Sequence, residues 1–453
     1  MSYTPHTDAD RDAMLAAIGI ESPENLFDPL PASARLSGLL SLPERLDEIS
    51  LVHHMRDLAS RNAGASRLVS FLGAGLYDHF SPAVVDAVIS RGEFATSYTP
   101  YQPELSQGML QAIYEFQSLV CALTGMDMAN ASMYDGATAA AEAALMLVDA
   151  ANRRQVVVAR SVHPHYRQVL QTYCTAADVS LVECPYGDGV TDAQEFRSSV
   201  TDATACVVVQ YPNFFGCLED LSALLNHCQT VGARTVVVTD PVSLGLLKPP
   251  GAYGADVVVG EGQGLGCPIG FGGPLLGFFA FKSEFQRRFP GRIVGMTQDG
   301  SGRRGFTMTL RTREQDIRRE RATSNICTNE ALVALAANVY LCSLGPRGLR
   351  QVADLCLQKA HYAADVLTKE CSVKLAFGAP FFKEFALYVD TRTPVHDLCR
   401  ALRGDGYLAG YPLGDAYPEL HNALLVAVTE KRTREQIDGL AAAVVRHMGR
   451  GGA

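Results

Sequence analysis

Between residues 65 and 325, short runs of apolar, mainly β-branched residues alternate with stretches of helical spacing. The runs are QVVVAR (155–160), VSLVEC (179–184), ACVVVQY (205–211), RTVVVTD (234–240), ADVVVGE (255–261) and LLGFFAF (275–281). A strand that is buried on both faces gives a continuous apolar run, and the helical stretches supply the crossovers between parallel strands. The pattern therefore predicts a mostly parallel sheet with helices on both faces.

Two helices of this region are expected to be buried. Residues 106–124 carry apolar side chains at helical spacing, namely Met109, Ile113, Phe116, Val120 and Leu123. Residues 137–150 are rich in alanine and nearly apolar around the whole circumference, as expected for a helix packed on a sheet.

The two ends of the chain have different patterns. Short helical stretches before residue 60 are interrupted by prolines 5, 23, 29, 31 and 43. After a helical stretch over 329–369, three apolar runs alternate with helical segments near 395–403 and 433–448; the runs are VKLAFG (373–378), FALYVD (385–390) and ALLVAVT (423–429). We predict an N-terminal helical arm (1–62), a large α/β domain (63–328) and a smaller C-terminal α/β domain (329–453).

The composition is that of a globular protein, and the net charge excludes some classes of main partner. The 453 residues are 47% apolar and 19% charged, which is typical of a globular chain with a large core. With 39 basic and 48 acidic residues the net charge is −9, which argues against nucleic acid or an anionic membrane as the main partner. The polar N-terminus and the absence of a run of about 18 apolar residues predict a protein that is neither exported nor membrane-spanning.

The twelve cysteines are widely spaced. Cys174 and Cys184, ten positions apart, are the closest pair, and no CxxC occurs. This spacing predicts reduced core thiols and a cytoplasmic location rather than a zinc ribbon or a thioredoxin-like site. His53-His54 and His163-Pro-His165 lack further ligands at metal spacing, so we predict no metal site.

A glycine-rich loop follows the strand that ends near Glu261. It reads GEGQGLG over 260–266, but the third glycine of a GxGxxG fingerprint is replaced by Leu265 in one register and by Cys267 in the other. A P-loop would also need GK[ST], which is absent. The loop is therefore not predicted to bind a dinucleotide or a nucleoside triphosphate.

The region 236–281 resembles fold-type-I pyridoxal-phosphate enzymes (aspartate-aminotransferase-like). In those enzymes an Asp after one strand pairs with the pyridinium nitrogen, and a Lys after the next strand forms the Schiff base. Here Asp240 fits the first position, but the second falls near Gln263 and Gly264. Lys248 and Lys282 are wrongly placed, and the amide of Gln263 cannot form an imine. This chain is therefore not expected to anchor the cofactor in the usual way.

Longer motifs point to a particular family. They are FLGAGLYDHFSPAVV (71–85), the segment from FATSYTPYQPELSQGML to YDGATAAAEA (94–143), GEGQ…GFGGP (260–274) and REQDIRRERATSNICTNEAL (313–332). Together they resemble the P-protein family of the glycine cleavage system, glycine dehydrogenase (decarboxylating). The match is to the first of two separately encoded halves and covers nearly the full chain.

The resemblance implies a partner, subunit 2, which carries the lysine that binds pyridoxal phosphate. The two chains together would decarboxylate glycine, release CO₂ and transfer the aminomethyl group to the lipoyl group of H-protein. A heterodimer, and a dimer of heterodimers, would be the expected assembly. Two alternatives remain: a non-catalytic assembly or regulatory partner of subunit 2, and a stand-alone pyridoxal-phosphate lyase that uses Lys248 or Lys282.

The segment before the helix at 106 is the candidate contribution to the partner's catalytic site. It contains Tyr98, Tyr101, Gln102 and Glu104, stiffened by Pro100 and Pro103. It is either a packed connector or, as the resemblance suggests, a rigid loop that reaches toward the partner's cofactor or the substrate channel.

Four residues are candidate remnants of a cofactor site on this chain: Asp135, His163, Asp240 and Gln263. Asp135 precedes the alanine-rich helix at the position where related enzymes hold phosphate, and a carboxylate there is better suited to capping the helix. Structural roles are also favoured for Asp240, His163 and His165.

Seven arginines fall within residues 303–321, at positions 303, 304, 311, 313, 318, 319 and 321. Acidic residues intervene, so one interpretation is a salt-bridged helix face. The other is a docking surface for subunit 2 or an acidic lipoyl carrier.

Overall fold

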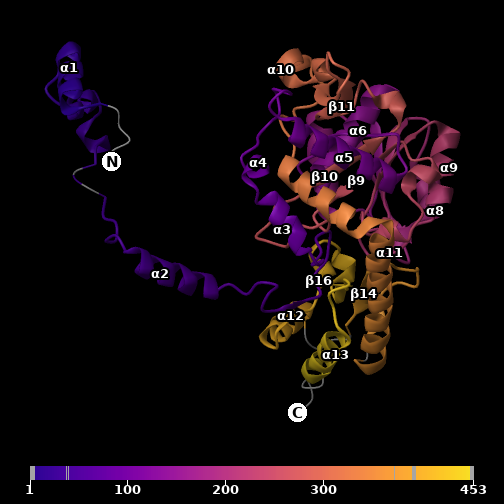
Figure 1. The fold of residues 1–453 in the computed structure, drawn as a ribbon. Coiled ribbons are helices and arrows are strands. Elements are labelled where there is room, and N and C mark those ends of the chain that lie inside the picture. Colours follow the sequence, from indigo (N-terminus) through magenta and orange to yellow (C-terminus); the bar gives the residue numbers. More distant parts are fainter. Residues whose placement is uncertain (1–5, 37, 39, 372, 390–393, 449–453) are drawn as a thin grey trace. The chain divides into compact units, whose positions relative to one another are not determined.

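The computed structural model describes residues 6–36, 38, 40–371, 373–389 and 394–448, and the chain divides into two units, residues 1–63 and 64–453 (Figure 1). Pro5, one of the prolines expected to interrupt the N-terminal arm, and Asp390, the last residue of the run FALYVD, lie outside the described residues.

The N-terminal unit consists of short helical segments, the longest being α1 (Asp8–Ile18) and α2 (Glu48–Ser60). A capping box starts α1, since the Thr7 hydroxyl accepts from the Asp10 amide at 3.3 Å and the Asp10 carboxylate accepts from the Thr7 amide at 2.8 Å. None of the described residues in this unit is buried. The unit therefore has no core of its own.

A seven-stranded sheet forms the larger part of the second unit. Its strands, in spatial order, are β2 (Met128–Ala129), β10 (Gly277–Phe281), β9 (Val257–Glu261), β8 (Arg234–Val238), β7 (Thr204–Gln210), β3 (Gln155–Ala159) and β4 (Ser180–Cys184). The pairs from β9 to β4 are parallel, whereas β10 is antiparallel to both of its neighbours. All six predicted runs are strands, and the expectation of a mostly parallel sheet is confirmed.

Helices pack against this sheet (Figure 1). They are α5 (Gln107–Thr124), α6 (Gly136–Ala151), α7 (Pro164–Ala176), α8 (Ala193–Ser199) and α9 (Leu221–Val231). In α5 the predicted apolar face is buried, except that Leu123 is only partly covered. Helix α6 lies across β7–β10, and its alanines let it approach the strands closely.

A second, antiparallel sheet has the order β13 (Lys374–Leu375), β14 (Glu384–Tyr388), β17 (Ala423–Ala427), β16 (Tyr411–Pro412). The helices α12 (Val395–Gly404) and α13 (Arg434–Met448) pack with it. Strand β1 (Val69–Ser70) pairs in parallel with β15 (Tyr407–Leu408), so residues 69–70 belong to this part of the unit although they precede the large sheet in the sequence.

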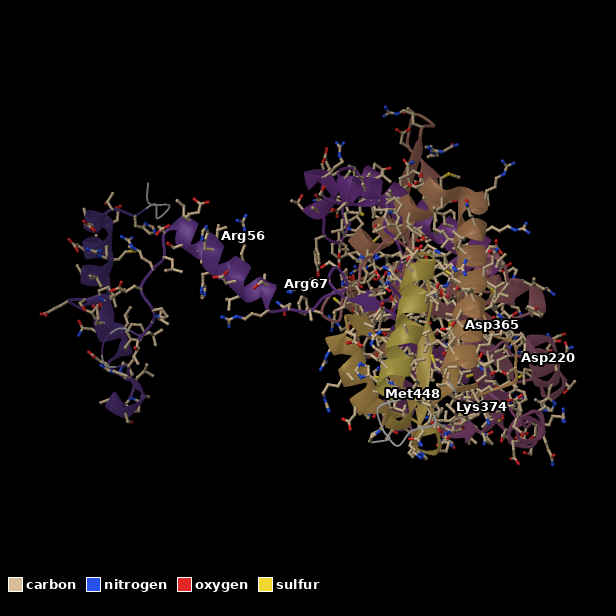
Figure 2. The ribbon with its side chains drawn as sticks, turned by 90° about the horizontal axis from the view of Figure 1, so that it is seen from below. Arg56, Arg67, Asp220, Asp365, Lys374 and Met448 are labelled. Atoms are coloured by element: carbon tan, nitrogen blue, oxygen red, sulfur yellow. The ribbon has the colours of Figure 1, made fainter. Side chains whose placement is uncertain are left out.

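Helix α11 (Ala331–Glu370) connects the two sheets. It bends at Gly345, where φ is 60°, and Pro346 follows. Side chains up to Cys356 pack in the core of the large sheet, and those from Ala360 onward pack in the core of the small sheet beside α13 (Figure 2, near Asp365 and Met448). The predicted boundary at 328/329 stays a prediction.

Among the described residues, α11 is the one helix that is long and apolar enough to cross a membrane, judged by length and composition. Half of its most apolar stretch is buried inside the unit. Such burial is typical of a core helix.

A hairpin completes the unit. Strands β11 (Ile293–Gln298) and β12 (Arg304–Thr309) pair antiparallel, and the short helix α10 (Gln315–Arg318) follows. The hairpin packs on α5, where the Gln107 side-chain amide donates to the Phe306 carbonyl and accepts from its N–H.

Candidate functional site

The candidate cofactor residues Asp135, Asp240 and Gln263 lie at the carboxyl edge of the large sheet. Asp240 follows β8 and Gln263 follows β9, and these two strands are parallel, so both residues lie at the same edge. Asp135 and Gly136 begin α6, which lies across β9. This is the edge at which fold-type-I enzymes hold their cofactor.

Lys383, from the segment entering β14 of the small sheet, occupies the place opposite Asp240. Its side chain is 2% exposed, and Nζ lies 2.7 Å from Oδ2 of Asp240. The same nitrogen lies 3.5 Å from the centroid of the Tyr77 ring. An ammonium group of the chain thus pairs with the carboxylate that would otherwise face a pyridinium nitrogen.

The ion pair continues into a buried chain of contacts. Nζ of Lys383 is 2.9 Å from Nε2 of His79, and Nδ1 of His79 is 2.6 Å from Glu430. Burial lowers the pKa of His79, and the Lys383 cation acts in the same direction. A neutral ring has one N–H, so Nε2 accepts from Lys383 and Nδ1–H donates to Glu430.

The carboxylate of Glu430 ends this chain. Burial opposes its ionisation, but hydrogen bonds from His79 and from the Phe80 amide outweigh burial and lower its pKa. Along the series the groups are in turn negative (Asp240), positive (Lys383), neutral (His79) and negative (Glu430). Every charge in the series has a direct partner.

Tyr77 and Glu384 form a second branch around Lys383. The Tyr77 hydroxyl donates to Oε2 of Glu384 at 2.6 Å, and Oε1 of Glu384 accepts from the Ala74 amide at 2.7 Å. Burial raises the pKa of Glu384 to about 7, although both hydrogen bonds oppose the rise. The segment 74–80 is thereby fixed to the small sheet.

Gln263 stands where the Schiff-base lysine would be, and its amide is fully engaged. Oε1 accepts from the Tyr77 amide at 3.1 Å, and Nε2 donates to the carbonyls of Tyr77 at 3.3 Å and Cys267 at 2.6 Å. The residue is 2% exposed. It ties two loops together and offers no nucleophile.

Two carboxylates occupy the N-terminus of α6. Asp135 caps the helix and accepts from the Thr138 amide at 2.7 Å. Glu261 accepts from the amides of Gly136 at 3.2 Å and Leu276 at 2.7 Å. Burial raises the pKa of Glu261 to about 7 against the effect of these hydrogen bonds. Two N–H groups at this helix end, those of Gly136 and Thr138, thus already have carboxylate partners.

Space is also filled at this point, since a Cβ added to Gly136 would lie 2.0 Å from the Tyr166 hydroxyl oxygen. The residues of this edge therefore do not fit pyridoxal phosphate: a lysine covers the Asp, a glutamine replaces the reactive amine, and carboxylates take the phosphate donors.

His163 has a structural role, whereas the side chain of His165 is exposed. Nε2 of His163 donates to the Ala74 carbonyl at 2.8 Å, and Nδ1 accepts from the His165 amide at 3.1 Å. Burial lowers the pKa of His163 to about 4, so the ring is neutral. Its nearest aromatic neighbour is Phe214, edge-on at 4.8 Å.

Neither lysine of the stand-alone alternative lies at the carboxyl edge. Lys248 is exposed, with Nζ 4.1 Å from the centroid of the Tyr253 ring. Lys282 binds Asp256 at 2.8 Å beside the first residue of β9, which is the opposite edge of the sheet. The geometry gives no support to imine formation by either residue.

Among the described residues, His79, Cys356 and Glu430 form the one group whose ligand atoms could surround a metal ion, all within 4.8 Å of one another. Both ring nitrogens of His79 are already engaged, one of them with the Lys383 ammonium. A cation at that position disfavours a metal, so this group is better explained as part of the ion-pair series.

The predicted catalytic loop lies elsewhere on the second unit. Tyr98 is 75% exposed and Tyr101 49%, and Gln102 and Glu104 are exposed in the following turn. The structure brings Tyr101 to a buried partner, since its hydroxyl accepts from Nη2 of Arg292 at 3.0 Å.

Lys383, Glu430 and Arg292 are not among the residues predicted from the sequence. One signal was available for the first of them: Lys383 and Glu384 interrupt the apolar segment FFKEFALYV (381–389). Charged residues are rarely buried unless they are paired, so two of them inside such a segment indicate partners elsewhere in the fold.

The seven arginines do not share a helix face. Arg313 is buried against the Phe289 ring and donates to the Gly291 carbonyl at 2.7 Å. Arg303 pairs with Asp299 and Arg311 with Asp316. The arginines at 304, 318, 319 and 321 are exposed on β12, α10 and the turn that follows. Ion pairs are present, but the expectation of one helix face is wrong, because the segment consists of β12 followed by three short helical pieces between residues 311 and 321.

Comparisons with known proteins give a consistent result. The family model described as "Glycine cleavage system P-protein" matches residues 1–444. Two relatives named "Probable glycine dehydrogenase (decarboxylating) subunit 1" are similar over nearly their whole length. The protein from Moorella thermoacetica is 52% identical, with 98% of this chain and 99% of that protein covered. The protein from Geobacillus thermodenitrificans is 50% identical, with 96% and 97% covered.

Solved structures agree. The crystal structure of glycine decarboxylase (P-protein) of the glycine cleavage system, in inhibitor-bound form, is 45% identical with a TM-score of 0.88, covering 98% of this chain and 100% of that one. A sphingosine-1-phosphate lyase from Burkholderia pseudomallei has a TM-score of 0.65 at 18% identity, covering 93% and 96%. The latter likeness shows the fold, which is that of fold-type-I pyridoxal-phosphate enzymes.

Proposed function

The chain belongs to the glycine cleavage system P-protein family, and we propose that it acts as subunit 1 of a glycine dehydrogenase (decarboxylating) that is active only together with subunit 2. Relatives that bear this name are about half identical to it over almost the full chain. The complex would decarboxylate glycine, release CO₂ and transfer the aminomethyl group to the lipoyl group of H-protein.

The observation that carries the division of labour is the Lys383–Asp240 ion pair. It supports the proposal that this chain does not bind pyridoxal phosphate through a Schiff base. The partner subunit would bind the cofactor through a lysine of its own. When bound there, the cofactor supplies the electron sink for decarboxylation. This chain would bind the partner, complete the walls of the pocket and exclude water.

The loop with Tyr98, Tyr101, Gln102 and Glu104 is the part that we propose to reach the partner's site. Tyr98 and Tyr101 expose aromatic rings within four positions of the chain, and clustered rather than single exposed apolar side chains mark interaction sites. Leu105, 81% exposed, continues the apolar surface. Such a rim, next to a buried arginine, suits a protein interface.

The exposed arginines 304, 318, 319 and 321 suit an acidic partner, and Ile317, half exposed among them, adds an apolar contact. We assign this surface to the acidic lipoyl carrier, H-protein. A dimer of heterodimers remains the proposed assembly. The twelve cysteines are all free thiols, which supports the proposed cytoplasmic location.

A purely assembling or regulatory role is the second candidate, and the filled sheet edge favours it, because this chain then has no cofactor chemistry of its own. The two roles differ in one respect. An assembling subunit needs the loop 98–104 only for binding, whereas a subunit that completes the site needs it for turnover.

The test combines the purified chain with subunit 2, pyridoxal phosphate and H-protein, and records the absorbance spectrum and glycine–CO₂ exchange. The proposal expects no imine band and no exchange for this chain alone, and a large rise in activity on pairing. An imine band in this chain alone would overturn it.

The loop is then tested with Tyr98→Phe and Tyr101→Phe, and with Tyr388→Phe as a matched control at a similarly exposed tyrosine of β14. A loss of turnover at unchanged affinity for subunit 2, in a loop variant and not in the control, supports the site-completing role. Unchanged turnover in both loop variants favours the assembling role.

A further inference from the structure

We propose that Arg292 is a positioning residue that holds Tyr101 so that its hydroxyl is presented as a hydrogen-bond donor to an oxygen anion of the substrate in the partner's site. The inference rests on the proposed function and deepens it, because it names the residue that sets the geometry of the loop.

Arg292 lies immediately before β11 and is 4% exposed. Its guanidinium joins two segments, 99–101 and 327–328. Nη1 donates to the hydroxyls of Thr99 at 2.9 Å and Thr328 at 3.1 Å, and Nη2 donates to the Tyr101 hydroxyl at 3.0 Å and to the Cys327 carbonyl. Both ends of the 99–101 segment are therefore bound to one rigid, planar group.

The charge of Arg292 is weakly compensated by carboxylates. Its closest acid is Glu314, with Nε and Oε2 3.5 Å apart. Burial raises the pKa of Glu314 while Arg292 and Arg313 oppose the rise. The short contacts of the buried Arg292 guanidinium are thus made with uncharged hydroxyl and carbonyl oxygens. Such an arrangement is costly for stability alone, since a neutral residue would avoid burying the charge.

The Tyr101 ring is placed between two cations. The guanidinium carbons of Arg292 and Arg311 lie 5.4 Å and 5.1 Å from its centroid. Because the phenolic oxygen accepts from Arg292, its own hydrogen remains for an outside acceptor. A hydroxyl that accepts from a charged donor is also polarised to donate more strongly.

Tyr101 is 49% exposed as a residue, so the loop that carries the donor is open to a partner chain. An oxygen anion is the acceptor that gains most from such a donor, and a carboxylate substrate such as glycine supplies one. Lysine cannot replace Arg292, because a single ammonium cannot span Thr99, Tyr101 and Thr328 as the planar fork does.

The first test uses the isolated chain and needs no activity. Hydrogen exchange followed by mass spectrometry should show faster exchange of residues 98–104 in Arg292→Lys than in the wild type, by at least several-fold. Arg288→Lys, which alters an exposed pair with Asp149, serves as the matched control. Unchanged exchange of 98–104 would overturn the positioning role, whatever the activity of the complex.

The second test is a double-variant cycle in the complex with subunit 2. Tyr101→Phe removes the donor and should raise KM for glycine in the exchange reaction about tenfold, because the carboxylate of the bound substrate loses a hydrogen bond. If Arg292 acts through Tyr101, adding Arg292→Lys to Tyr101→Phe should raise KM little further. Equal increases in KM from Arg292→Lys in both backgrounds would overturn the inference.

The two tests separate the hypotheses. A wild-type complex without exchange activity would refute the proposed function and, with it, the donation of Tyr101 to a substrate, while the hydrogen-exchange result would still decide whether Arg292 holds the loop.

Discussion

Nζ of Lys383 lies 2.7 Å from Oδ2 of Asp240, so a residue of the small sheet neutralises the carboxylate at the edge of the large sheet. Lys383 is buried and Asp240 is mostly covered, with 2% and 14% of their side chains exposed. The pair therefore joins the two sheets by charge at a point where related enzymes hold a small molecule.

Breaking this pair should strongly destabilise the chain. Lys383→Met leaves Asp240 charged and buried, and the free energy of unfolding should fall by about 3–5 kcal/mol. Urea denaturation of the isolated chain measures the loss. Lys369→Met, which breaks an exposed i,i+4 pair with Asp365, should cost less than about 1 kcal/mol.

The double variant Asp240→Asn/Lys383→Met removes both charges and should recover a large part of that loss, because no uncompensated charge remains. If the double variant were as unstable as the sum of the single variants, the direct pairing would not be the source of the effect.

Restoring a lysine at position 263 should not restore cofactor binding. In Gln263→Lys, Lys383 still covers Asp240, and Asp135 and Glu261 still occupy the N-terminus of α6. We expect no labelled residue 263 after incubation with pyridoxal phosphate, borohydride reduction and peptide mapping. Subunit 2 is the positive control. Stoichiometric labelling at 263 would show that the edge can still open for the cofactor.

Glu142 should make the stability depend on pH. It lies on α6 with 7% exposed, and burial raises its pKa to about 7, against a hydrogen bond with Ser324. The folded state therefore binds this proton more tightly than the unfolded state, for which the usual value is 4.5. Between these two values the stability contributed by Glu142 falls as the pH rises.

Glu142→Gln removes this titration. The variant should be more stable than the wild type by about 1–3 kcal/mol at pH 8, with the difference vanishing near pH 4. Urea denaturation at both pH values provides the comparison. A difference that is the same at both pH values would point to packing rather than to the proton.

The exposed arginines should govern binding of the lipoyl carrier. Arg318→Glu/Arg321→Glu should weaken the affinity for H-protein at least tenfold at low salt, and the effect should shrink as ionic strength rises, because exposed charges are screened. Calorimetric titration of the assembled complex measures both. The matched control is Arg197→Glu, at an exposed position on α8, and an equal effect there would exclude a specific surface.

The main elements of the fold could be predicted because their signals are local. A continuous apolar run such as ACVVVQY needs no distant partner to be identified as a buried strand, and the capping role of Asp135 follows from its place before an alanine-rich helix. The direction of β10 could not be predicted, since an apolar run carries no information on whether its neighbour is parallel.

The site was only partly predictable for a related reason. Asp240 and Gln263 could be placed because each follows a strand of the same sheet. Lys383 and His79, which touch, are 304 positions apart in the chain, and no spacing rule relates them. Arg292 was hidden in the same way, because the threonines and the tyrosine that it binds come from separate segments.

The cation opposite Asp240 is synthesised with the polypeptide. An enzyme whose two domains meet around a vitamin-derived molecule depends on the cellular supply of that molecule to reach its mature form. This chain carries the cation opposite Asp240 on its own residue, Lys383, so under the proposed function we expect its folding not to require the vitamin. A shortage of the vitamin would then leave subunit 1 folded but unpaired, and only subunit 2 would lack its cofactor.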